Sequence, residues 1–227
     1  MLLYYITDRR QLPGDETTRR RALLDKIAEA ASCGVDFIQL REKDLAGGEL
    51  ESLARDAIQL IRECHGNQQT PRTRLLINSR VDVAIACGAD GVHLRSNDIS
   101  TKDVRHIWRS AENSNGSSPL MSVSCHTTAQ VARAASDGAD LVVFAPVFDK
   151  RDMPQTVPTG LQALRDACGH KIPVLALGGV TVDNARSCIA EGAAGIAGIR
   201  LFQEQEIAET VRRLQAISFS TKTTNQH

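Results

Sequence analysis

The sequence lacks a long apolar segment, a surplus of charge of either sign and a closely spaced pair of cysteines. No run approaches the roughly 18 consecutive apolar residues of a membrane span, so no membrane partner is expected. Lys plus Arg and Asp plus Glu both total 27. A net charge of zero gives no electrostatic reason to expect nucleic acid as a partner either.

The cysteines and the N-terminus bear on the compartment. The six cysteines include no Cys-x-x-Cys pair, and disulfide frameworks are typical of short secreted chains, so none is expected here. Residues 1–10 form an apolar stretch too short for a secretory signal, and no cleavage site follows. We therefore expect a cytoplasmic protein.

A repeated phrase organises the 227 residues, of which 42% are hydrophobic and 24% charged. A glycine that ends a helix and a two-residue turn precede an apolar run four times, starting at Gly34, Gly88, Gly138 and Gly192. These starts are 54, 50 and 54 residues apart. Because one strand–helix unit of a barrel takes about 25–30 residues, the repeat marks every second unit of an eight-fold barrel.

Apolar runs between amphipathic segments predict strands that are buried on both faces. The predicted strands are 2–7, 37–41, 75–78, 91–94, 120–124, 141–145, 174–177 and 195–199. Helices are expected between them, for example at 17–33 and 49–64, and polar loops at 66–72 and 113–119. The pattern predicts an α/β fold, a single (β/α)₈ TIM barrel over 1–217 with a flexible C-terminal tail at 218–227. It leaves the oligomeric state open, a homo-oligomer included.

Function in such barrels lies at the C-terminal ends of the strands. Gln39, Arg41 and Lys43 alternate there and share one face, with Asn78 after the next strand. An amide and two cations suit a polar or anionic ligand, although an exposed strand end with Arg41 paired to a neighbour would show the same pattern.

A glycine pair follows the seventh predicted strand. Gly178 and Gly179 precede a helix expected near Thr181, and Arg200 follows the eighth strand. Barrels often bind phosphate on these two loops, where glycines allow a close approach of the backbone. The alternative, a tight turn without a ligand, is the weaker hypothesis.

For other polar residues near the strand ends, the sequence leaves a functional and a structural role open. His126 follows the fifth strand and is equally suited to acid–base catalysis or to a packing role. Cys125 beside it has no base implied to activate it. Asp98 would either ligate a cation or cap a helix that begins near Ser100 or Thr101.

The motifs, taken in order, carry a family resemblance. They are Tyr5-Ile6-Thr7-Asp8, Gln39-Leu40-Arg41-Glu42-Lys43, Asn78-Ser79-Arg80-Val81-Asp82, Gly88-Ala89-Asp90-Gly91-Val92-His93-Leu94, Ser122-Val123-Ser124-Cys125-His126, Gly138-Ala139-Asp140, and Ala176-Leu177-Gly178-Gly179-Val180 with Asn184. Over nearly its whole length the chain resembles the thiamine-phosphate synthase and TenI family.

The resemblance implies a reaction and site residues. The synthase joins a pyrimidine diphosphate to a thiazole phosphate: diphosphate leaves, a pyrimidine carbocation forms, and the thiazole nitrogen attacks it. Mg²⁺ and basic side chains neutralise the departing charge. Gln39, Arg41, Lys43 and Asn78 match the positions for pyrimidine diphosphate, Asp98 a metal ligand, Ser124 a diphosphate-binding or active-site serine, and Gly179 the cradle for thiazole phosphate.

Three departures from the synthase pattern stand out. Ser79 replaces the aspartate of an Asn-Asp-Arg motif, and a neutral serine is a poor Mg²⁺ ligand. Residues 149–153 lack the Thr-x-Thr-Lys motif after the sixth strand, and Arg200 replaces a serine. The sequence leaves open whether Mg²⁺ still binds and what the 149–153 loop does.

These losses favour the TenI type, which the resemblance implies is a thiazole tautomerase that moves a proton without a metal. His126, with Ser124 beside it, would be the acid–base group, while the loops with Gly178, Gly179 and Arg200 hold thiazole phosphate. The alternative is a divergent thiamine-phosphate synthase that uses Mg²⁺. A second alternative is a non-catalytic regulator that binds thiazole phosphate.

Overall fold

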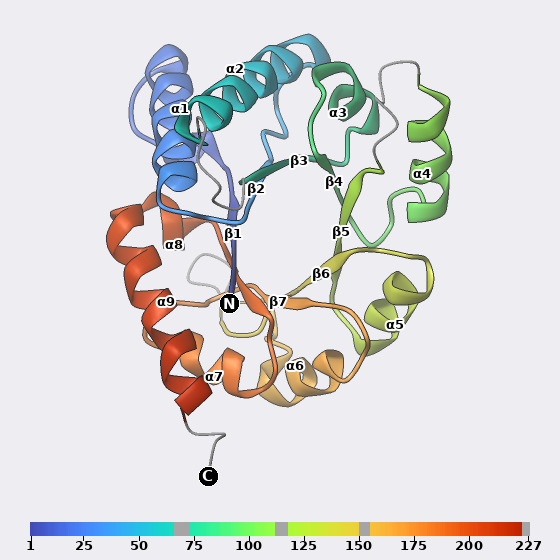
Figure 1. The fold of residues 1–227 in the computed structure, drawn as a ribbon, viewed down its shortest axis with the longest axis vertical. Helices are drawn as coiled ribbons and strands as arrows, with labels where there is room; N and C mark the ends of the chain where they lie inside the picture. The colour runs from blue at the N-terminus through green and yellow to red at the C-terminus, as the bar shows by residue number, and fades with distance from the viewer. Residues whose placement is uncertain (66–72, 112–117, 150–154, 224–227) are drawn as a thin grey trace.

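Eight parallel strands close into a barrel in the computed structural model, which describes residues 1–65, 73–111, 118–149 and 155–223 (Figure 1). Each strand pairs with its sequence neighbours, and β8 returns to β1 through the Leu2–Gly195 register. The strands are β1 (Leu2–Ile6), β2 (Phe37–Leu40), β3 (Arg74–Asn78), β4 (Gly91–Leu94), β5 (Leu120–Cys125), β6 (Leu141–Phe144), β7 (Val174–Ala176) and β8 (Gly195–Gly198). The predicted barrel is therefore confirmed.

Helices form a ring outside the strands (Figure 1). They are the 3₁₀ helix η1 (Arg9–Gln11), α1 (Glu16–Ser32), α2 (Gly47–His65), α3 (Val81–Cys87), α4 (Thr101–Ser110), α5 (Thr128–Ser136), α6 (Gly160–Cys168), α7 (Ala185–Ala190), α8 (Arg200–Gln203) and α9 (Ile207–Thr223). Helix α9 continues past 217, where the barrel was predicted to end, and 224–227 lie outside the described residues. No helix in the described ranges is long and apolar enough to cross a membrane.

The glycines of the repeat lie at or near helix ends, as the pattern predicts. Gly34, Gly88, Gly138 and Gly192 all have positive φ, from +68° to +95°, directly after or near a helix end. The predicted loop 66–72 lies outside the described residues, as does most of 113–119.

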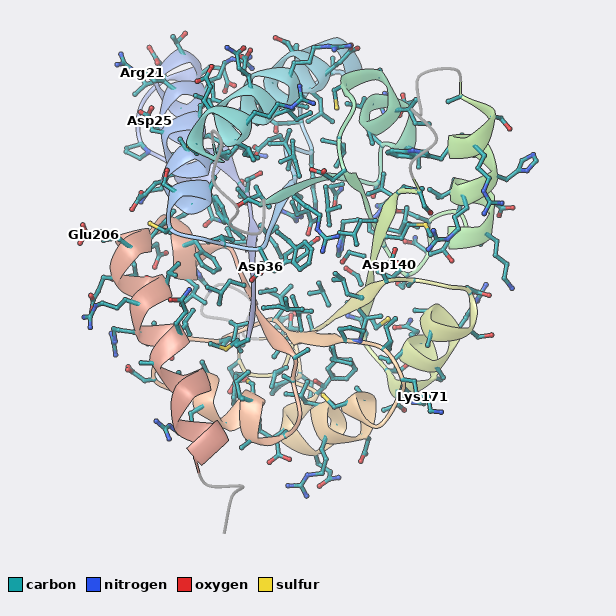
Figure 2. All side chains as sticks on the ribbon, viewed as in Figure 1. Arg21, Asp25, Asp36, Asp140, Lys171 and Glu206 are labelled. Carbon is teal, nitrogen blue, oxygen red and sulfur yellow. The ribbon has the colours of Figure 1, made fainter. Side chains whose placement is uncertain are left out.

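The aspartates of the same phrase have a role that the sequence pattern did not reveal. Asp36 accepts a hydrogen bond from the backbone N–H of Leu3, at 2.8 Å between N and Oδ2. Asp90 and Asp140 do the same for the N–H groups of residues 75 and 121, at 2.8 and 2.7 Å. Each carboxylate therefore fixes the start of the preceding strand; Asp36 and Asp140 are labelled in Figure 2.

Side chains alternate between two cores because successive residues of a strand point to opposite faces. The inner core comprises Tyr4, Ile6, Phe37, Leu76, Leu141, Val143, Leu175 and Ala197. The larger outer core packs the strands against the helices. Toward the C-terminal ends of the strands the inner residues become polar, beginning with His93 and Gln39.

We expect Asp36→Ala to lower the free energy of unfolding by about 1–3 kcal/mol, because it leaves the buried N–H of Leu3 without its acceptor. Burial raises the pKa of the Asp36 carboxyl, which fits its enclosed position. Urea denaturation measures the change. Asp25→Ala, at an exposed position of α1, is the control and should change stability by less than about 0.5 kcal/mol. Equal effects at the two positions would contradict this role.

Candidate functional site

A pocket of about 990 Å³ opens at the C-terminal ends of the strands. Its walls include Gln39, Arg41, Lys43, Asn78, Ser124, His126, Gly178, Gly179 and Arg200. The structure thus brings together every predicted site residue except Asp98, which lines a separate cavity of about 150 Å³ beside it. The larger volume suits a ligand of drug-like size.

An amide pair lies deep in this pocket. Gln39 is 1% exposed, and its Nε2 donates to Oδ1 of Asn78 at 2.8 Å. Among the described residues, Oε1 of Gln39 is buried and has no hydrogen-bond partner. A buried carbonyl oxygen without a donor is costly, so an N–H or O–H donor from a ligand or a water molecule would complete this site.

Two cations stand above the amide pair at the end of β2. Arg41 lies 4.0 Å from the Asp8 carboxylate, a loose contact that leaves most of its fork of donors for other partners. The charge of Arg41, together with burial and Arg95, lowers the pKa of Lys43. Because Arg41 and Lys43 repel one another at the pocket opening, their positions favour binding of an anionic ligand.

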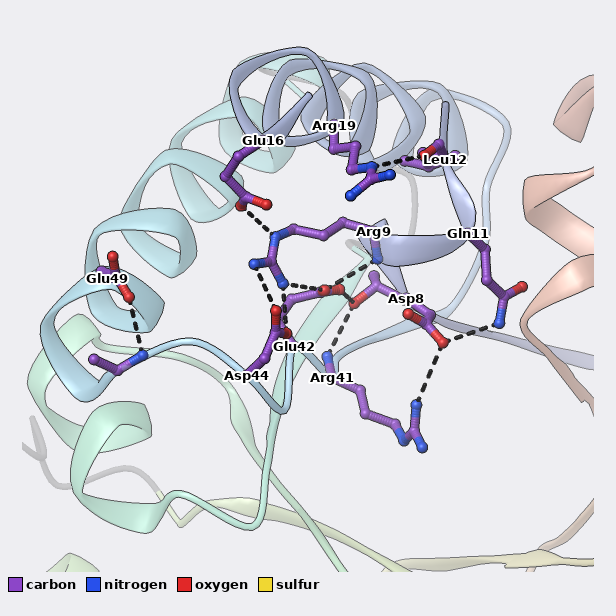
Figure 3. Close-up of polar contacts among 12 residues, drawn as sticks. Asp8, Arg9, Gln11, Leu12, Glu16, Arg19, Arg41, Glu42, Asp44 and Glu49 are labelled. Carbon is purple, nitrogen blue, oxygen red and sulfur yellow. Dashed lines mark hydrogen bonds and ion pairs between the residues drawn. The ribbon is translucent and has the colours of Figure 1, made fainter. Parts of the chain in front are cut away.

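A buried ion-pair network holds these cations in place (Figure 3). Arg9 and Glu42 are almost fully buried, and their side chains meet at 3.1 Å. Arg9 also pairs with Asp44 at 2.8 Å and with Glu16 at 2.6 Å. Burial lowers the pKa of Arg9, but these hydrogen bonds outweigh it and raise that pKa above its usual value.

Side chains continue to alternate just past the end of β2, and this alternation explains how the network positions the site. Arg41 and Lys43 face the pocket, whereas the intervening Glu42 points the other way, toward Arg9. Glu42 also accepts from the Thr7 hydroxyl at 2.5 Å, and the same hydroxyl accepts from the backbone N–H of Arg41 at 2.9 Å. The backbone between the two cations is therefore anchored to the loop after β1.

A second buried network centres on His93 of β4. Its Nδ1 lies 3.1 Å from the Tyr4 hydroxyl and 2.9 Å from that of Ser122, and its Nε2 lies 2.8 Å from Oγ of Ser124. Burial, with the charge of Arg41, lowers the pKa of His93 to about 3, so the ring is neutral at pH 7. Ser124 at the pocket wall is thus held by a neutral imidazole, a role that the sequence analysis missed; the signal was a histidine at an inward-facing position of a buried strand.

His126 is exposed at the pocket wall with one ring nitrogen fixed. Its Nδ1 lies 2.8 Å from the carbonyl oxygen of Ala145, which can only accept, so Nδ1 carries a proton. In the neutral ring Nε2 then has the free lone pair of a base. Cys125 next to it is fully buried, and burial raises its thiol pKa to about 12, which rules out a thiolate nucleophile near neutral pH.

The glycine turn after β7 packs closely against residues 148 and 149. Gly179 has φ +63°, and an added Cβ would lie 2.4 Å from the backbone oxygen of Asp149. The helix expected near Thr181 in fact begins at Ala185, because the Asn184 side chain first closes a turn, accepting from the Thr181 N–H and donating to the Gly179 carbonyl. The prediction of a helix that starts near Thr181, directly after the glycine pair, is therefore wrong.

Asp98 does not cap the following helix, because Ser100 occupies that position and accepts from the N–H of Asp103. Instead Asp98 accepts four hydrogen bonds: from the Ser79 hydroxyl at 2.6 Å, and from the backbone N–H, Nε and Nη2 of Arg95 at 2.8, 3.1 and 2.9 Å. The pKa of Asp98 is lowered: burial raises it, but these hydrogen bonds outweigh burial.

This arrangement does not fit a divalent cation. A carboxylate offers about four lone-pair directions, and all four at Asp98 are taken. In the described ranges no group of three or more His, Cys, Asp or Glu side chains is placed to hold a metal. Mg²⁺ requires an octahedron of oxygens, and here it would first have to displace Arg95.

The barrel and its pocket define the class of protein: a (β/α)₈ barrel with a polar, partly cationic site at the C-terminal ends of its strands. Within that class, the model of the family described as thiamine monophosphate synthase matches residues 3–202. The chain belongs to this family, and hence to the enzymes of thiamine biosynthesis.

Relatives and a solved structure agree with this assignment. Thiamine-phosphate synthase of Roseiflexus castenholzii is 36% identical to this chain, and the alignment covers 87% of this chain and 79% of the relative. Thiamine-phosphate synthase of Methanoculleus marisnigri is 35% identical, and the alignment covers 94% of this chain and 93% of the relative. The structure of thiamine phosphate pyrophosphorylase from Pyrococcus furiosus superposes with a TM-score of 0.77 at 28% identity, covering 96% of each chain.

We expect Glu42→Gln to destabilise the protein by about 3 kcal/mol, because it leaves Arg9 buried with one charge partner fewer. Urea denaturation measures the loss. The control is Glu51→Gln, which breaks a more exposed pair with Arg55 and should cost at most about 1 kcal/mol. If the two variants were equally stable, the network would not be a structural anchor.

The low pKa of His93 predicts acid sensitivity. Below about pH 6.5 the unfolded chain binds a proton that the folded chain refuses until pH approaches about 3, so stability falls as pH drops through this window. Between pH 7 and pH 5 the wild type should lose about 2 kcal/mol more than His93→Gln. His106→Gln, at an exposed position, should keep the wild-type profile. Parallel profiles for wild type and His93→Gln would contradict the assignment.

Proposed function

We propose that this protein is a thiamine-phosphate synthase that joins a pyrimidine diphosphate to a thiazole phosphate. One observation carries the proposal: the buried, unpartnered Oε1 of Gln39 lies beneath the cations Arg41 and Lys43. An aminopyrimidine diphosphate offers both complements, an N–H donor for the amide oxygen and a polyanion for the cations. A thiazole phosphate by itself offers only the anion.

The chemistry asks the site to stabilise a leaving group. The bond between the pyrimidine methylene carbon and the diphosphate oxygen breaks, and its electron pair leaves with diphosphate. Arg41 and Lys43, with Arg95 on the same wall, are placed to neutralise that charge. The thiazole nitrogen then bonds to the carbocation, so no proton has to be removed from the attacking atom.

The second substrate is assigned to the opposite side of the pocket. Gly178, Gly179 and Arg200 follow β7 and β8, where barrels commonly bind phosphate. Only glycine fits at 179, because the backbone oxygen of Asp149 and the Phe148 side chain lie directly against it. Ser124, fixed by His93, lies on the wall beyond β5 and is placed to donate or accept a hydrogen bond at the reacting end.

A second candidate function, that of a thiazole tautomerase, depends on His126. A thiazole tautomerase needs one residue that takes and returns a proton, and the fixed Nδ1–H of His126 leaves Nε2 as that base. The relatives, however, are named synthases, and the unpartnered Gln39 has no role in tautomerisation. The tautomerase is therefore ranked second, the reverse of the order that the sequence alone favoured.

The test supplies purified protein with pyrimidine diphosphate, thiazole phosphate and Mg²⁺ and follows diphosphate release. We expect turnover well above the rate without protein. Gln39→Leu should reduce kcat/KM on the order of tenfold or more, because it removes the acceptor for the substrate. Gln59→Leu, on the exposed face of α2, is the control. No release by the wild type would overturn the proposal.

His126→Ala separates the two candidate functions. In a synthase the variant should keep diphosphate release within a few fold of the wild type. In a tautomerase, given the carboxylated thiazole phosphate tautomer, it should lose on the order of 10²–10⁴ in rate, the usual contribution of general acid–base catalysis. Loss of tautomerase turnover together with absent diphosphate release would decide for the second candidate.

A further inference from the structure

Arg95 and Asp98 occupy the place where the family resemblance implies a magnesium site. The synthase pattern has an aspartate at position 79 and a metal-ligating aspartate at 98, two carboxylates for one divalent cation. Here position 79 is a serine, whose hydroxyl donates to Oδ2 of Asp98 rather than offering a second negative charge. The loss of a carboxylate therefore coincides with a guanidinium bound to the remaining one.

The local charge is balanced without a metal. Two carboxylates and a divalent cation sum to zero, and so do one carboxylate and one guanidinium. The lone pairs of Asp98 are saturated by Ser79 and Arg95, so a cation would have to break hydrogen bonds to enter. The backbone supports the geometry: Ser79 has φ +59°, an uncommon conformation outside glycine, which places its hydroxyl against Asp98.

Arg95 is also placed to meet a ligand. Its side chain is 60% exposed while that of Asp98 is 11% exposed, so the carboxylate is the enclosed anchor and the guanidinium the accessible group. Arg95 lines the main pocket together with Arg41 and Lys43. Asp98 engages Nε and Nη2, and a guanidinium has five N–H donors in a fork that matches phosphate oxygens.

We propose that Arg95, held by Asp98 and Ser79, takes the place of the divalent cation and binds the diphosphate, so that diphosphate binding does not require Mg²⁺. This inference deepens the proposed function and rests on it for the identity of the substrate. It makes Arg95 a diphosphate-binding residue and Asp98 and Ser79 the residues that position it.

The first experiment measures binding of inorganic diphosphate to the full chain by calorimetry, in EDTA. The wild type should bind, and Arg95→Gln should bind on the order of tenfold more weakly, because one charge-assisted contact is lost. Arg95→Lys keeps the positive charge but lacks the forked donors of the guanidinium, so its affinity for diphosphate should lie between those of the wild type and Arg95→Gln. The control is Arg55→Gln, whose side chain is 56% exposed and pairs with Glu51 away from the pocket; it should bind like the wild type.

The second experiment titrates Mn²⁺ alone, followed by electron paramagnetic resonance. The wild type should bind it at least about tenfold more weakly than Ser79→Asp combined with Arg95→Gln, which restores two carboxylates and removes the guanidinium. Aspartate adopts positive φ more readily than most residues, so this exchange suits the backbone at 79.

Each result counts for or against the inference. It is overturned if diphosphate binds the wild type only with Mg²⁺ or under neither condition, if Arg95→Gln binds as tightly as the wild type, or if Mn²⁺ binds the wild type as tightly as the double variant. Failure of the proposed function shows differently: diphosphate binds in EDTA and depends on Arg95, yet the two substrates with Mg²⁺ yield no release.

Discussion

The two-residue period of a strand in a closed barrel is the constraint on which the rest of this structure depends. Inward-facing positions form an apolar core near the N-terminal ends of the strands and become polar toward the C-terminal ends, where Gln39, Asn78 and Ser124 line the pocket. Just past the end of β2 the alternation continues: Arg41 and Lys43 face the pocket, whereas Glu42 faces Arg9. One strand end thus supplies both the ligand-facing charges and their structural anchor.

The enclosed charges of Arg9, Glu42 and Asp98 are paired, whereas the pocket wall gathers charges of one sign. Arg9 pairs with three carboxylates, and Asp98 pairs with Arg95 and accepts a hydrogen bond from the Ser79 hydroxyl. By contrast, the pocket wall collects cations whose mutual repulsion is visible in the lowered pKa of Lys43. The Asp8 carboxylate offsets part of this repulsion, and an anionic ligand would reduce it further.

The departures from the family pattern are physically connected. The Ser79 substitution removes a carboxylate and provides a hydroxyl donor, and Arg95 completes the coordination of Asp98. Considered without Arg95, Ser79 indicates a lost metal site and therefore favours the tautomerase, which needs no metal. Viewed with Arg95, it is equally compatible with diphosphate chemistry in which a fixed guanidinium carries the charge.

The sequence by itself determined the barrel, its strand bounds to within a residue or so, and the set of residues around the pocket, because the glycine phrases, apolar runs and strand ends are local signals. It placed a helix at Thr181 where a side-chain turn intervenes, and it treated Asp98 as a cap or metal ligand. Only the tertiary structure decided the partners of Asp98, the burial of Arg9 against Glu42, and the contact of His93 with Tyr4 and Ser124. Apart from the contact of Asp98 with Arg95 in its own loop, these contacts join residues from different strands and loops, and which of them meet depends on barrel register and side-chain packing, which no local pattern encodes.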